Sequence, residues 1–116
     1  MKTTKKMIET MAGFLDLQKK MNEALSRQPK SAKGAEDMVL EATSFMGKTI
    51  NQVEAIIALS ESMTDKDFKD LHKRGLPIKS RKAFISTARL YVKELSKELA
   101  LVKYKIEELK AAKART

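Results

Sequence analysis

The chain has 116 residues and a mass of 13.1 kDa, which suits one domain with its own apolar core. Its hydrophobic share of 42% and charged share of 34% are typical of a folded, water-soluble protein, and the formal net charge of +9 favours acidic partners. The absence of cysteine and the presence of a single histidine, His72, exclude a disulfide framework, a thiolate zinc site and a histidine metal cluster.

The longest apolar run covers only residues 55–59, well short of the roughly 18 residues that a membrane-spanning helix needs. We therefore expect a cytoplasmic protein with no membrane partner. Because the side chains required by most catalytic mechanisms are missing, we also expect no enzymatic activity, no cofactor and no metal site.

Helix-forming residues dominate the whole chain, which contains only four glycines and two prolines. The composition predicts an all-α protein. A first helix is expected over residues 4–28, because apolar residues recur there at helical spacing. The expected stripe consists of Met7, Met11, Phe14, Met21 and Leu25, widened by Ile8 and Leu15. The segment 29–34 contains a proline and a glycine, so we expect a turn and a helical hairpin.

Capping residues, a glycine and a proline divide the rest of the chain into three further helices. A second helix is expected over residues 35–62 and a short third helix over residues 65–74. Thr64 and Asp67 have the spacing of a capping box, and Gly75 is a suitable terminator. Ser80 is the expected N-cap of a last helix that continues almost to the C-terminus. The prediction is thus one domain, a bundle of three long helices and one short helix.

The last helix carries a heptad pattern. Apolar residues recur every seven positions in two series, which are Ile85, Val92, Leu99, Ile106 and Ala88, Leu95, Val102, Leu109. A helix of about 35 residues is about 50 Å long, much longer than a compact domain of this size. We expect its first half to pack against the preceding helices and the part beyond Ser96 to need a partner.

Two assignments of the heptad residues follow. The first divides the chain into residues 1–79, a hairpin plus the short helix, and residues 80–116, a helix that forms a coiled-coil homodimer. Its predicted interface consists of Val92, Leu95, Leu99, Val102, Ile106 and Leu109. In the second assignment the same residues meet the first two helices of their own chain, as in a three-helix bundle.

The positive charge is unevenly distributed. Residues 34–62 have one basic and five acidic side chains, whereas residues 71–93 contain no carboxylate. Arg81 and Lys82 stand in the first turn of the last helix, where the helix dipole disfavours cations, and a helix N-terminus with Ser80 would suit a phosphate group. The residues expected to bind nucleic-acid phosphates are Lys73, Arg74, Lys79, Ser80, Arg81, Lys82, Arg89, Lys93 and Lys97.

These observations lead to one main functional hypothesis. We expect a regulatory or packaging protein that self-associates through its last helix and binds nucleic acid through phosphate contacts. Only two tyrosines and no tryptophan are present, so no aromatic platform for base stacking is predicted. Two alternatives remain open: the lysines only solvate the helices, or the chain is an adaptor, assembly factor or inhibitor that binds a protein through heptad or methionine-rich surfaces.

Overall fold

Four helices make up the described part of the chain. The computed structural model describes residues 2–76 and 80–115. Over these residues the helices are α1 (Lys2–Ser26), α2 (Ala32–Ser62), α3 (Asp65–Lys73) and α4 (Arg81–Arg115), and no strand is present. The predicted all-α bundle of three long helices and one short helix is confirmed. Its extents of 61 × 23 × 20 Å describe a rod about two helix diameters thick.

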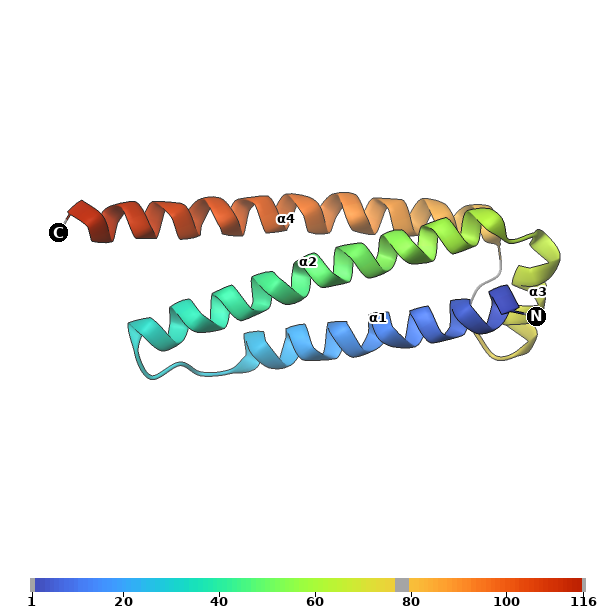
Figure 1. Cartoon of the computed structure of the whole chain (residues 1–116), viewed down its shortest axis with the longest axis horizontal. Coiled ribbons are helices and arrows are strands. Elements are labelled where there is room, and N and C mark those ends of the chain that lie inside the picture. Colours follow the sequence, from blue (N-terminus) through green and yellow to red (C-terminus); the bar gives the residue numbers. More distant parts are fainter. Residues whose placement is uncertain (1, 77–79, 116) are drawn as a thin grey trace.

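The three long helices lie along the rod, with α2 between α1 and α4 (Figure 1). α2 runs antiparallel to both neighbours, so α1 and α4 point in the same direction. The short helix α3 lies across the end of the rod at which α1 begins and α2 ends. None of the helices in the described residues combines the length and apolar character needed to cross a membrane.

The turn between α1 and α2 is shorter than the sequence indicated. α1 ends at Ser26, and α2 begins at Ala32, inside the segment that we expected to be entirely a turn. The reason is Ser31, whose hydroxyl oxygen accepts a hydrogen bond from the backbone N–H of Gly34 at 3.0 Å. This N-cap satisfies one of the free donors at the helix start, so the helix can begin three residues early.

The capping box of α3 is confirmed. The Thr64 hydroxyl accepts from the Asp67 backbone N–H at 3.2 Å, and the Asp67 carboxylate accepts from the Thr64 N–H at 2.9 Å. α3 ends before Gly75, whose φ of +95° is a conformation that favours glycine. The helix is anchored by Phe68 and Leu71, which are 2% and 0% exposed.

The core has two parts along the rod. One lies at the α3 end, where Phe68 and Leu71 pack with Met7, Ile56 and Met63. The other lies further along α2 and consists of Met46, Ile50 and Leu95, with Met21, Tyr91, Val92 and Leu99 packed against it. α2 contributes to both parts, so its apolar positions hold the bundle together.

Two residues of the predicted α1 stripe do not belong to the core. Leu15 is 61% exposed and Leu25 is 53% exposed, so placing them in the buried stripe was wrong. Beyond its contact with α3 at Met7, α1 has only α2 and part of α4 as neighbours, and a rod of three long helices buries a narrower stripe of each helix than a closed bundle would.

α4 stays in contact with α2 beyond Ser96. Leu99 packs against the second core cluster, and Ile106 is 9% exposed and lines a small cavity with Val39 of α2. This differs from the expectation that the second half of the helix needs a partner. Because α2 is itself 31 residues long, it can follow α4 over most of its length.

Candidate nucleic-acid interface

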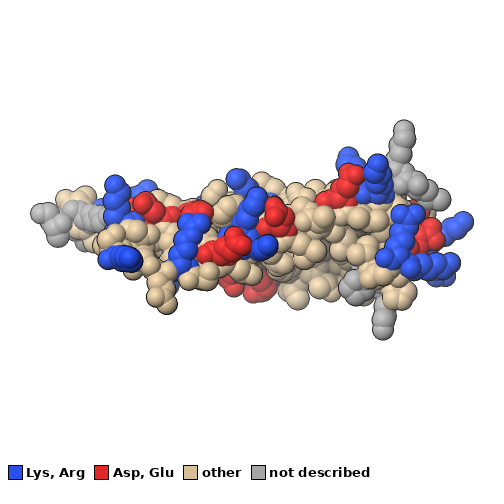
Figure 2. All heavy atoms as spheres, turned by 90° about the horizontal axis from the view of Figure 1, so that it is seen from below, with Lys and Arg blue, Asp and Glu red and all other residues tan. Residues whose placement is uncertain are grey.

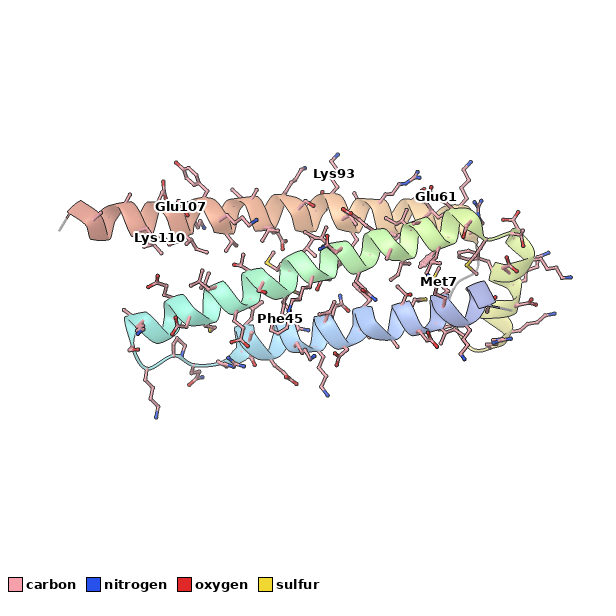
Figure 3. All side chains as sticks on the ribbon, in the orientation of Figure 1. Met7, Phe45, Glu61, Lys93, Glu107 and Lys110 are labelled. Atoms are coloured by element: carbon pink, nitrogen blue, oxygen red, sulfur yellow. The ribbon has the colours of Figure 1, made fainter. Side chains whose placement is uncertain are left out.

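The residues predicted to bind phosphates lie at one end of the rod and along α4. Lys73 and Arg74 are exposed at the C-terminal end of α3. Lys79 lies outside the described residues. The others follow one another from Ser80, just before α4, to Lys97 in its middle. Figure 3 shows the labelled side chain of Lys93 pointing away from α2, toward solvent.

Arg81 makes contacts inside the molecule. Its Nε donates a hydrogen bond to the carbonyl oxygen of Ser60 at 2.9 Å, and one terminal nitrogen donates to the carbonyl oxygen of Glu61 at 3.0 Å. Both carbonyls belong to the last turn of α2, where backbone acceptors lack helical partners and the helix dipole is negative. Arg81 therefore ties the start of α4 to the end of α2, a structural reason for the cation that our interpretation as a phosphate ligand overlooked.

Two other cations of the predicted set have carboxylate neighbours. Arg89 pairs with Glu61 of α2, with a terminal nitrogen 2.6 Å from a carboxylate oxygen. Lys97 pairs with Glu94, one turn earlier in α4, at 3.9 Å. All four side chains are about half exposed or more, and such surface pairs contribute only about 0–1 kcal/mol. A phosphate group could therefore replace either carboxylate.

Lys82 and Lys93 are exposed and form no ion pair with any described residue. Arg89 lies seven positions after Lys82 and four positions before Lys93, which places all three residues on one side of α4. We call these three residues the basic stripe. It is about 17 Å long at 1.5 Å per residue. Ser80 accepts a weak bond from the Ala83 N–H at 3.4 Å, so its hydroxyl acts as the expected N-cap.

Similarity to other proteins gives no further guidance. No protein-family model, curated protein or solved structure matches this chain. In the part of the chain that the structure describes, no group of three or more histidine, aspartate and glutamate side chains is placed to hold a metal ion. The exposed cations of this arrangement can bind anions.

The opposite side of the rod differs in charge. Figure 2 shows the α1 side, on which lysine and arginine alternate with aspartate and glutamate, and a wide uncharged area separates two groups of charged residues. Mixed charge of this kind gives no continuous cationic surface. The basic stripe of α4 is therefore the better candidate for contacts with phosphates.

An apolar groove is the second candidate site, and it includes part of the methionine-containing stripe of the first helix. It has a volume of about 520 Å³ and lies between α1, α2 and α4. Phe14 and Tyr91 meet in it edge to face with ring centroids 5.7 Å apart, and the Tyr91 hydroxyl accepts from Gln18 at 3.2 Å. Met11 and Phe14, both on the predicted stripe of the first helix, line the groove and were the sequence signals for it.

The predicted oligomer interface lies mostly against α2 of the same chain. Leu95 and Ile106 are 7% and 9% exposed, and Val92, Leu99 and Val102 are half-buried. Only Leu109 is open to solvent, at 65%. A second copy could reach this seam only if α4 first left α2.

Proposed function

We propose that this chain is a non-enzymatic protein that binds the phosphate backbone of nucleic acid through the basic stripe of α4 and the end of α3, and that it self-associates through α4. The observation that carries the proposal is a pair of exposed lysines, Lys82 and Lys93, neither of which has an acidic partner among the described residues. The chain as a whole has a net charge of +9. Such cations bind phosphates independently of base sequence.

The basic stripe adds a third cation at a modest cost. Arg89 must exchange Glu61 for a phosphate, and this costs little because the pair is solvated. Lys73 and Arg74 extend the cationic surface to the end of the rod. No aromatic platform accompanies these residues, so binding should depend on charge and should weaken steeply with added salt.

The test is a binding titration with random-sequence duplex DNA and single-stranded RNA at several salt concentrations. Lys82→Glu with Lys93→Glu should weaken binding roughly tenfold or more and lower the salt slope by about 0.9 for each lost phosphate contact. The control, Lys19→Glu with Lys30→Glu, makes the same change of net charge on α1 and the following loop. Equal losses in both variants, or no binding by the wild type, would contradict the assigned site.

The apolar groove favours a second candidate, an adaptor that binds a helix of another protein. Its lining by Met11, Phe14, Phe84 and Tyr91 suits an amphipathic helix. Material that copurifies from cells separates the two functions. Nucleic acid that nuclease removes supports the first, whereas a nuclease-resistant protein that Met11→Glu releases supports the second.

A further inference from the structure

α4 has a second row of residues at helical spacing, on the side away from α2 except at its start, where Ala83 and Thr87 also line the apolar groove. We call this set the outer row. Every member is exposed. The row consists of Ala83, Thr87, Leu90, Glu94, Lys97, Leu101, Tyr104 and Glu108. Its large apolar members, Leu90, Leu101 and Tyr104, are 58%, 61% and 64% exposed, which is unusual for three such residues on one side of one helix.

The spacing alternates between four and three residues, as in the seam of a coiled coil. Since the heptad seam already faces α2, the outer row is a separate surface for a second helix. At 100° per residue, the heptad seam and the outer row lie on nearly opposite sides of α4. A second helix on the outer row would therefore pack on the side of α4 that is nearly opposite to α2.

The outer row is complementary to itself when reversed. If two copies of α4 lie antiparallel with their midpoint between Leu95 and Ser96, Leu90 faces the partner's Leu101 and Glu94 faces the partner's Lys97. Thr87 likewise faces the partner's Tyr104. In the single chain Glu94 and Lys97 are 3.9 Å apart and well exposed, so both are free to turn toward a second copy. A twofold axis makes each of these contacts twice.

We propose that two copies of this chain pair antiparallel through the outer row of α4, with leucine contacts flanking two Glu94–Lys97 ion pairs. This inference rests on the self-association part of the proposed function and supplies its surface. It also removes the need for α4 to leave α2, which a dimer through the heptad seam would require.

The pairing places the two basic stripes on one face. An antiparallel pair has its twofold axis perpendicular to the plane of the two helices, so residues that face along this axis lie on the same face of the pair in both copies. Lys82, Arg89 and Lys93 lie about a quarter turn from the outer row. The dimer would therefore carry a cationic strip from Lys82 to the partner's Lys82, about 40 Å long, the length of about 12 base pairs.

The first experiment measures self-association by sedimentation over a range of concentrations. Leu90→Glu with Leu101→Glu should raise the dimer dissociation constant roughly tenfold or more, because it places carboxylates where leucines meet. The control, Leu15→Glu with Leu25→Glu, replaces two leucines of α1 that are 61% and 53% exposed and should leave the constant unchanged. A wild type that stays monomeric at every concentration, or equal weakening in both variants, overturns the proposal.

Charge reversal tests the register. Glu94→Lys alone places two like charges opposite each other and should weaken the dimer, whereas Glu94→Lys with Lys97→Glu should restore it. Failure of the double variant to recover self-association contradicts the proposed pairing. Circular dichroism of each variant shows that the helices are retained.

The orientation is tested by crosslinking, which the absence of cysteine makes simple. A mixture of Leu90→Cys and Leu101→Cys chains should form a disulfide-linked heterodimer on oxidation, and Leu90→Cys alone should form little. Efficient linkage of Leu90→Cys to itself would indicate a parallel pair and refute the antiparallel arrangement. None of these measurements uses nucleic acid, so the two proposals can fail separately. A wild-type dimer that does not bind DNA would contradict only the phosphate site. A wild-type monomer that binds DNA in a salt-dependent way would contradict only the dimer.

Discussion

Replacing Arg81 with alanine tests whether this residue holds the fold together. The substitution removes the two hydrogen bonds to the Ser60 and Glu61 carbonyls, at 2.9 and 3.0 Å, and the cation beside the C-terminus of α2. Hydrogen bonds from a charged donor contribute about 1.5–3 kcal/mol each when buried. Here one bond is only partly buried and the other is exposed, so we expect the free energy of unfolding to fall by about 1–2 kcal/mol in total.

Lys82 is the matched control, because it is the next cation in the same turn and forms no ion pair with a described residue. Lys82→Ala should change stability by less than about 0.5 kcal/mol. Urea unfolding followed by circular dichroism measures both variants, and thermal unfolding of Arg81→Ala should show a midpoint roughly 4–10 °C lower.

The two variants should also separate stability from binding. Lys82→Ala should weaken nucleic-acid binding without affecting unfolding, whereas Arg81→Ala should affect unfolding. If Arg81→Ala is as stable as the wild type, the link between α4 and the end of α2 contributes nothing measurable, and the structural explanation for this arginine is wrong.

Three further predictions concern the packing. Phe68→Ala should lower the free energy of unfolding by about 3–5 kcal/mol in a urea titration, because Phe68 is 2% exposed and stacks edge to face on Phe84; a loss under 1 kcal/mol would contradict its place in the core. Gly75→Ala should destabilise by about 1 kcal/mol because φ is +95°, whereas Gly47→Ala, with open space around it, should stabilise by about 0.5–1 kcal/mol; changes of the same sign in calorimetry would refute this contrast. Gly13→Ala should destabilise, because the new Cβ would lie 2.8 Å from the Gln52 amide nitrogen that donates to the Thr10 carbonyl, and Gln52→Ala should abolish most of that penalty in a double-mutant cycle.

The fold could be predicted where local rules act alone. The Thr64 capping box, the glycine at position 75 and the start of α4 all follow from neighbouring residues and are confirmed. The exposure of Leu15 could not be predicted, because the width of a buried stripe depends on how many helices surround it. The heptad pattern of α4 specified a helical neighbour without specifying that α2 would supply it.

The candidate site was predictable only in part, for a similar reason. Exposure of Lys82 and Lys93 agrees with their positions in a carboxylate-free segment. The contacts of Arg81 and Arg89 with residues 60 and 61 were missed, because they join positions at least 20 residues apart. Counting charges along one segment of the sequence does not include an acidic residue that the fold brings close from another helix.

The core is more deeply buried at the α3 end of the rod than at the C-terminal end of α4, so local unfolding should begin at the latter end. At the α3 end, α1, α2 and α3 supply buried side chains and the partly buried Phe84 of α4 packs against them, whereas beyond Ile106 none of the α4 side chains that the structure describes is buried. Backbone amides should therefore exchange with solvent deuterium most slowly around Ile56 and fastest in the last turns of α4. A peptidase should shorten the rod from that end while the remainder keeps its cooperative melting.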